Sequence, residues 1–171
     1  MSVDIHQERG LLSGRRVTQR PPRTQSVRHE VLLAAPPEKV FDFCLTPEGY
    51  SAIMPTRITM KGQTDEEIGQ GSSVAWNFWL MNVIPVRWVA HIAEHDRPRQ
   101  FVDLQLRGLF TYFRHTHSCE PHGTGTLYRD EVEFASRMGA FVDRTAVRAE
   151  LNRNFRHRQR RMREILGAGG A

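Results

Sequence analysis

Most of the chain after residue 26 consists of short segments in which apolar and polar residues alternate. Alternation with a period of two is typical of strands that bury one face, and β-branched and aromatic residues are frequent here. Turn residues separate the segments, as in Gly69-Gln70-Gly71 and Arg97-Pro98. Seven strands are predicted, at residues 27–33, 57–62, 73–80, 85–95, 100–106, 112–120 and 126–134. Because the last six follow one another with only turns between them, we expect an antiparallel meander.

Three other segments repeat their apolar residues every three to four positions, which predicts helices. Two short helices are expected directly after the first strand, at about 37–44 and 46–53, each with a proline in its first turn. The third, at 140–166, lacks Pro and Gly and is about seven turns long. Its apolar face is predicted to contain Phe141, Thr145, Leu151, Phe155, Met162 and Leu166. One sheet with a long terminal helix belongs to the α+β class.

Composition places the chain among globular proteins of one domain. Its 171 residues are 39% hydrophobic and 25% charged, which is close to the average of folded domains. Residues 1–26 hold five arginines and little periodicity, so they are predicted to be a flexible arm before a domain at 27–171. No segment resembles a signal peptide or a membrane span, which favours a cytoplasmic protein without stable membrane insertion. Cys44 and Cys119 lack metal-ligand spacing and are expected to be buried, reduced thiols.

Aromatic residues on alternate strand positions indicate one strongly apolar face of the sheet. Trp76, Phe78 and Leu80 share a face of one predicted strand, and Trp88 shares a face with Ala90 and Ile92 on the next. Further rings come from Phe101, Phe113 and Phe134. Such a face can be the wall of a ligand cavity or part of an ordinary filled core, and both interpretations remain open.

Two histidines and several acids fall on the same face by parity. His115 and His117 alternate with polar residues on one strand, and Tyr128 and Asp130 share the inner face of the next. A hairpin turning through residues 121–124 pairs His115 with Asp130 and His117 with Tyr128, and the preceding hairpin pairs Asp103 with His115. An imidazole between two carboxylates can perform acid or base chemistry, orient a polar ligand or only fix the strand register.

Several motifs follow one another in the order strand, two helices, six strands and helix. They are the opening segment VLLAAPPEKVF at 31–41, Pro85-Val86-Arg87-Trp88, Phe101-Val102-Asp103, Arg107-Gly108, Arg114-His115-Thr116-His117 and Asp130-Glu131-Val132. In these motifs the chain resembles the SRPBCC, or START-like and Bet v 1-like, superfamily over about residues 27–166, especially its polyketide cyclase/dehydrase and lipid-transport branch. The resemblance implies a helix-grip fold: a curved seven-stranded antiparallel sheet wrapped on the long C-terminal helix, with two short helices after the first strand.

The resemblance also implies an internal cavity between sheet and helix, without a metal or cofactor. We therefore expect the chain to bind a small hydrophobic or aromatic ligand, such as a polyketide-like or lipid-like molecule. The residues predicted to bind it are Trp76, Phe78, Trp88, Phe101, Asp103, Phe113, His115, His117, Tyr128 and Asp130.

Two functions of other classes remain open. One is a polyketide aromatase/cyclase or dehydratase, with His115 as the base and Asp130 or Asp103 beside it. The other is an accessory protein for nucleic acid or an anionic surface, acting through a basic helix face. That face comprises Arg144, Arg148, Arg153, Arg156, Arg158, Arg160, Arg161 and Arg163. No aromatic stacking residues accompany these arginines, so a solvated face is favoured and no nucleic acid partner is expected.

Two further interpretations concern ions and assembly. A zinc site made of His115, His117 and Asp130 is conceivable, but His-x-His is a frequent accident and no metal is predicted. A homodimer is compatible with the sequence, which contains no feature that decides the oligomeric state.

Overall fold

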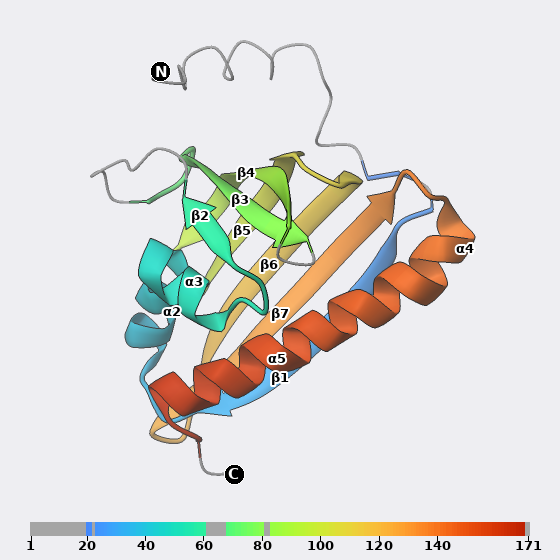
Figure 1. Cartoon of the computed structure of the whole chain (residues 1–171). Coiled ribbons are helices and arrows are strands. Elements are labelled where there is room, and N and C mark those ends of the chain that lie inside the picture. The colour runs from blue at the N-terminus through green and yellow to red at the C-terminus, as the bar shows by residue number, and fades with distance from the viewer. Residues whose placement is uncertain (1–19, 22, 61–67, 81–82, 170–171) are drawn as a thin grey trace, which may run out of the picture.

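Seven antiparallel strands form one sheet in the order β1-β7-β6-β5-β4-β3-β2, in the computed structural model of the chain (Figure 1). The structure describes residues 20–21, 23–60, 68–80 and 83–169. The strands are β1 (Gln25–Leu33), β2 (Ile58–Met60), β3 (Ser73–Leu80), β4 (Ile84–Asp96), β5 (Gln100–Arg107), β6 (Phe110–His122) and β7 (Gly125–Ser136). The predicted meander is confirmed for β2 to β7, while β1 pairs with β7 at the opposite edge.

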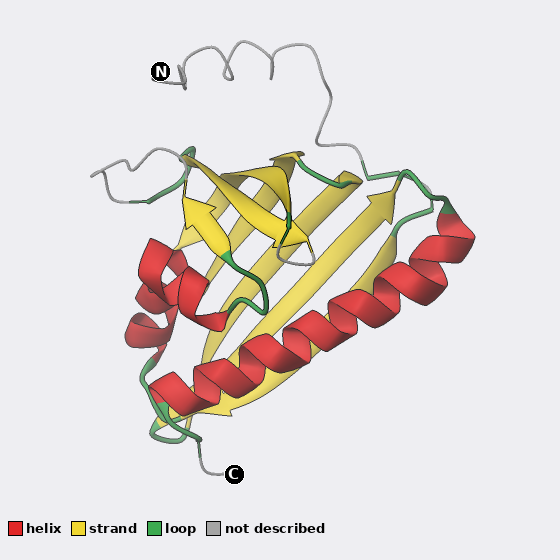
Figure 2. Cartoon of the chain, in the orientation of Figure 1, coloured by secondary structure: helices red, strands yellow, loops and turns green. Residues whose placement is uncertain are grey.

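Helices cover one face of this sheet. The short helices α2 (Pro37–Leu45) and α3 (Pro47–Ile53) follow β1, and each begins with a proline. The Thr46 hydroxyl caps α3 by accepting the Gly49 N–H at 3.1 Å. The long C-terminal segment consists of α4 (Ala140–Val142), the π-helical turn η1 (Asp143–Val147) and α5 (Arg148–Leu166). Figures 1 and 2 show α5 crossing the sheet and ending near α2 and α3, as expected for a helix-grip fold.

Two groups of buried apolar residues hold the helices on the sheet. One joins α2 and α3 to the strands and to the end of α5, and includes Phe41, Ile53 and Met162. The other lies under the start of α5, where Phe155 packs with Val132 and other residues of β1, β6 and β7. Burial of such side chains contributes about 1.5–3 kcal/mol each. The two groups thus hold α2, α3 and α5 against the same face of the sheet.

The start of the C-terminal helix differs from the prediction. Phe141 and Thr145, expected on the apolar face, are exposed, Phe141 to 70%. The π-helical turn adds a residue to the helical repeat at 143–147, which rotates the buried face. Asp143 is buried there instead, and its carboxylate accepts the Ser136 N–H at 2.9 Å. From Leu151 onward the predicted face is directed to the sheet.

The first strand begins earlier than predicted. β1 begins at Gln25, so its first two residues belong to the segment predicted to be an arm. Residues 1–19, which make up most of that segment, lie outside the described residues, and the flexible arm stays a prediction. Of the strand predicted at 57–62, Ile58–Met60 form β2. Residues 61–62 also lie outside the described residues.

Candidate functional site

The paired histidines lie on the inner face of the central strands, as their parity predicted. His115 and His117 of β6 are both buried. Asp103 comes from β5 on one side, and Tyr128 and Asp130 come from β7 on the other. Three adjacent strands therefore bring five polar side chains together beneath the helices. We call these five residues the polar cluster.

The register of one hairpin differs from the prediction. Asp103 is opposite His115, as predicted. However, His115 is opposite Val132, and His117 is opposite Asp130. The β6–β7 turn is shorter than expected because Gly123 adopts a positive φ of 56°, so both strands continue through His122 and Gly125. The shift is an even number of residues, so every side chain keeps its predicted face.

Each of the two imidazoles still contacts both carboxylates. His115 contacts Asp130 diagonally, because the residue directly opposite it on β7 is Val132. His115 Nε2 is 2.8 Å from Asp130 Oδ1, and its Nδ1 is 3.5 Å from Asp103 Oδ2. His117 Nε2 is 3.0 Å from Asp103 Oδ2, and its Nδ1 is 2.6 Å from the Tyr128 hydroxyl. The Tyr128 hydroxyl donates to Asp130 Oδ1 at 3.0 Å. The hydrogen bonds thus link all members of the polar cluster.

A buried arginine completes this network. Arg158 was predicted on the basic outer face of the C-terminal helix, but it is 5% exposed and faces the sheet. Its guanidinium lies 3.7 Å from Asp130 Oδ1 and over the rings of Tyr50 and Phe155. The signal was present in the sequence: Arg158 follows Phe155 by three residues and precedes Met162 by four, which is the spacing of a buried face.

Burial and charge determine the protonation of the cluster. Burial alone would raise the pKa of Asp130, but Arg158 and His115 outweigh it and hold that pKa well below its usual range. Burial also opposes ionisation of Asp103, whose pKa is nevertheless lowered by the hydrogen bond from His117 and the charges around it. Burial and the neighbouring His115 lower the pKa of His117 to about 4. At neutral pH the two acids are therefore ionised, and the His117 imidazole is neutral.

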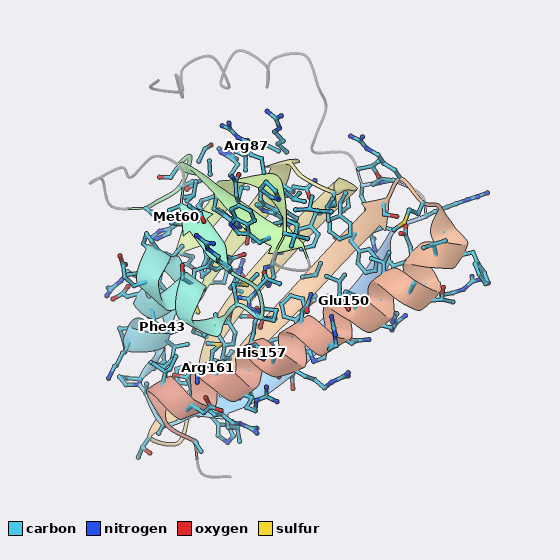
Figure 3. The ribbon with its side chains drawn as sticks, viewed as in Figure 1. Phe43, Met60, Arg87, Glu150, His157 and Arg161 are labelled. Carbon is cyan, nitrogen blue, oxygen red and sulfur yellow. The ribbon has the colours of Figure 1, made fainter. Side chains whose placement is uncertain are left out.

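A pocket of about 60 Å³ lies beside the polar cluster, between α2, α3 and strands β2 to β6. Figure 3 shows Met60, one of its lining residues, on β2 near these helices. The walls are mostly apolar. The lining residues are Cys44, Leu45, Thr46, Pro47, Tyr50, Met60, Ile68, Val74, Trp76, Ala90, Ile92, Phe101, Asp103 and His117.

The predicted ligand-binding residues divide into three groups. Trp76, Phe101, Asp103 and His117 line the pocket. His115, Tyr128 and Asp130 do not line it and are linked to it through their contacts with Asp103 and His117. Phe78, Trp88 and Phe113 form an aromatic cluster next to Trp76, with ring centroids 5.1–6.3 Å apart. For all of them, a role in binding stays a prediction.

Sequence reasoning missed the opposite wall of the pocket. Thr46, Pro47 and Tyr50 come from the junction of α2 and α3, and Ile68 lies just before β3. Strand parity gives no information about residues in a helix junction or a loop. Only the packing of α2 and α3 against the sheet places them here.

Part of the polar cluster has the composition of a metal site. One ligand atom each from Asp103, His115 and His117 lies within 4.8 Å of the others. The set weighed from the sequence contained Asp130 in place of Asp103, but Asp130 instead contacts His115 Nε2 and the Tyr128 hydroxyl. Aspartate and histidine are ligands that zinc and related ions accept.

The remaining predictions concern the cysteines, the arginines of the C-terminal helix, membrane spans and assembly. Cys44 and Cys119 are buried free thiols, as expected. Most of the predicted arginine face of the C-terminal helix is exposed, including Arg153, Arg156 and Arg163. Among the described helices, none has the length and apolar composition required to cross a membrane. The homodimer stays a prediction.

Solved structures share this fold at low sequence identity. A protein from Chromobacterium violaceum, CV1439, has a TM-score of 0.69 at 13% identity, over 83% of this chain and 96% of its own. The Zhui aromatase/cyclase from Streptomyces sp. R1128 has a TM-score of 0.63 at 18% identity, over 86% and 99%. The major latex-like protein 151 from Panax ginseng has a TM-score of 0.64 at 12% identity, over 84% and 97%. These likenesses confirm the helix-grip fold that the order of the predicted elements indicated.

The sequence itself matches one family model over most of its length. No curated protein matches it significantly. The model described as polyketide cyclase / dehydrase and lipid transport matches residues 24–167, which include the whole sheet, the pocket and the C-terminal helix. The chain therefore belongs to the polyketide cyclase / dehydrase and lipid transport family.

Proposed function

We propose that the chain binds a small apolar molecule that carries one polar group, in the pocket beside the polar cluster. The observation that carries this proposal is the lining of the pocket. Rings and aliphatic chains form nearly all of it, while among the described lining residues Asp103 supplies the one carboxyl group and His117 the one imidazole. Apolar walls with a few convergent polar groups are typical of small-molecule sites.

The ionised state of Asp103 indicates which polar group fits. Its lowered pKa makes the carboxylate an acceptor at neutral pH, so it binds a ligand through an O–H or N–H donor. Phe101 and His117, whose rings stack on each other with centroids 4.0 Å apart, both line the pocket next to this acceptor. A phenol or a hydroxylated ring system combines both requirements.

The volume of the pocket limits what enters without rearrangement. About 60 Å³ is some four times the roughly 15 Å³ that one water molecule needs, and less than the roughly 150 Å³ cavity that accepts benzene. A ligand of one or two rings therefore has to extend through the mouth or displace side chains such as Met60. Longer polyketide-like or lipid-like ligands belong to the same proposal only if the walls open further.

A fluorescence titration with 2-naphthol tests the proposal, because Trp76 lines the pocket and reports binding. Ala90→Leu places three extra carbons in the pocket, and we expect it to weaken binding at least about tenfold. Ala75→Leu is the matched control, since Ala75 lies on β3 between the lining residues Val74 and Trp76 and faces the other way. Equal affinities for the two variants would overturn the proposal. Native mass spectrometry of the purified chain then identifies any ligand that it retains.

A cyclase or dehydratase is the second candidate, because a carboxylate and an imidazole both reach the pocket wall. The family description and the fold of the Zhui aromatase/cyclase support it. His115 is not among the lining residues, so His117 is the better placed base. Turnover of a linear polyketide mimic that is lost in His117→Gln supports this candidate. Tight binding of the same mimic without turnover supports the binding protein.

A further inference from the structure

We propose that Asp103, His115 and His117 bind one divalent transition-metal ion beside the pocket. The proposal concerns the protein and the metal alone, and it stands or falls independently of the proposed organic ligand. It departs from the expectation, based on the sequence, that no metal binds.

The spacing of the three side chains suits one ion. His115 Nδ1 is 3.5 Å and His117 Nε2 is 3.0 Å from the same oxygen, Asp103 Oδ2. Metal–ligand bonds of about 2.0–2.2 Å in a tetrahedral arrangement separate two ligand atoms by about 3.3–3.6 Å. The two distances to Asp103 Oδ2 therefore lie close to this separation, and one ligand atom from each of the three residues lies within 4.8 Å of the others.

Each imidazole also has the outer partner that metal-binding histidines usually have. The ring nitrogen directed away from the proposed ion contacts Asp130 Oδ1 in His115 and the Tyr128 hydroxyl in His117, at 2.8 and 2.6 Å. Such partners fix the ring orientation and leave the other nitrogen available for the metal. Asp130 connects the two outer contacts, because its Oδ1 accepts hydrogen bonds from His115 and from the Tyr128 hydroxyl. The outer contacts thus form one connected support.

The charges around the three ligands are compatible with an ion of charge +2. Asp103 neutralises one of its charges, and Asp130 lies in the outer support with Arg158 at 3.7 Å. Arg158 thus pairs with the outer carboxylate rather than with a proposed ligand atom. Two imidazoles with one carboxylate favour zinc, iron, cobalt or nickel over magnesium and calcium, which prefer oxygen ligands.

The position of the site leaves room for a further ligand. Asp103 and His117 line the pocket, and the third proposed ligand, His115, does not. Three protein ligands and one open position are typical of metal sites that bind water or a small molecule. The adjacent pocket, with a volume of about 60 Å³, is large enough for the water molecule that would occupy this position.

Titration of the chelator-treated chain with Zn²⁺, followed by calorimetry, tests the proposal. We expect one ion per chain, an affinity about 100-fold lower in Asp103→Asn, and an affinity 10–100-fold lower in Tyr128→Phe, which removes only an outer partner. His122→Gln is the matched control because His122 is an exposed histidine of the same strand, and it should bind like the unchanged chain. Mg²⁺ at the same concentration should not bind.

Two results would overturn the proposal. One is the absence of Zn²⁺ binding at micromolar concentration, and the other is equal binding by Asp103→Asn and the unchanged chain. If Asp103→Asn fails to fold, the visible spectrum of the unchanged chain with Co²⁺ decides. Intense absorption bands of a four- or five-coordinate ion support the site, whereas the weak band of a six-coordinate hydrated ion contradicts it.

Discussion

At the scale of single residues, strand parity determines the face on which the polar cluster lies, and the turn at Gly123 determines which of its residues are opposite one another. Asp103, His115, His117 and Tyr128 all lie on the predicted inner face, because parity survives a register shift of two residues. The predicted partner of His115 on β7 was wrong. The length of the turn depends on the positive φ of Gly123, a conformation that glycine permits but that the sequence does not require.

The prediction for Arg158 was wrong, because this arginine was placed on the exposed face of the C-terminal helix and is buried. Arginines occupy so many positions of α5 that a charged side chain on the buried face does not stand out by type, although its spacing does. The buried carboxylate of Asp130 makes its burial favourable, and the two residues meet only when the sheet and the helix pack together. The combination of composition and spacing, rather than either alone, would have identified it.

Replacing this arginine should destabilise the fold strongly. Arg158→Met keeps the apolar stem but leaves the ionised Asp130 without its cation. We expect the free energy of unfolding to fall by about 3–5 kcal/mol, the usual cost of breaking a buried pair from one side. Urea denaturation at pH 7 measures it. Arg156→Met, two residues away and exposed, should change the free energy by less than about 0.5 kcal/mol. Similar losses in the two variants would mean that the Asp130–Arg158 pair contributes little.

The buried thiols should be chemically inert in the native protein. Burial raises the pKa of the Cys44 thiol to about 12 and also raises that of Cys119. Because the thiolate is the reactive form, a raised pKa leaves almost none at pH 8. Colorimetric labelling with a disulfide reagent at pH 8 should therefore detect no reactive thiol in the folded chain and two in urea. Rapid labelling of the native chain at pH 8 is the result that would contradict this.

At the scale of elements, the seven strands and three helices were predicted because each has a clear period. The helix predicted at 140–166 has the bounds that the structure shows. What the period could not show is the π-helical turn η1, since one additional residue in a turn changes the buried face without changing the helical composition. The buried carboxylate of Asp143 and the exposed ring of Phe141 are consequences of that turn.

Asp143 should be the residue that holds η1 against the end of β7. Its Oδ2 accepts the Ser136 N–H at 2.9 Å. Asp143→Ala leaves that N–H without its acceptor, so the free energy of unfolding should fall by about 1–3 kcal/mol. Thermal denaturation followed by circular dichroism measures the loss. Thr145→Ala, on the exposed side of the same turn, is the control and should have little effect. If both variants unfold alike, the contact does not stabilise the turn.

At the scale of the whole molecule, the order of elements was enough to predict the helix-grip fold, and the family and the solved structures agree. The pocket was not predictable in the same way. It is the volume left between α2, α3 and strands β2 to β6, and such a volume depends on how closely separate elements pack rather than on the pattern of any one of them. For the same reason Trp88 and Phe113, which have the parity of pocket residues, belong to an aromatic cluster instead.

A pocket built from several elements exists only in the folded chain, so its ligand should stabilise the whole molecule. With 2-naphthol at 100 times its dissociation constant, the free energy of unfolding should rise by about 2.7 kcal/mol. For a chain of 171 residues, this corresponds to a rise in melting temperature of about 5 to 10 °C. The shift should shrink in Ala90→Leu, whose pocket is partly filled, and persist in Ala75→Leu. A shift of equal size in both variants would show that the molecule binds elsewhere, for example on exposed rings such as Phe141. Scanning calorimetry of the three proteins with and without ligand therefore distinguishes a pocket shared by the elements from adsorption to the surface.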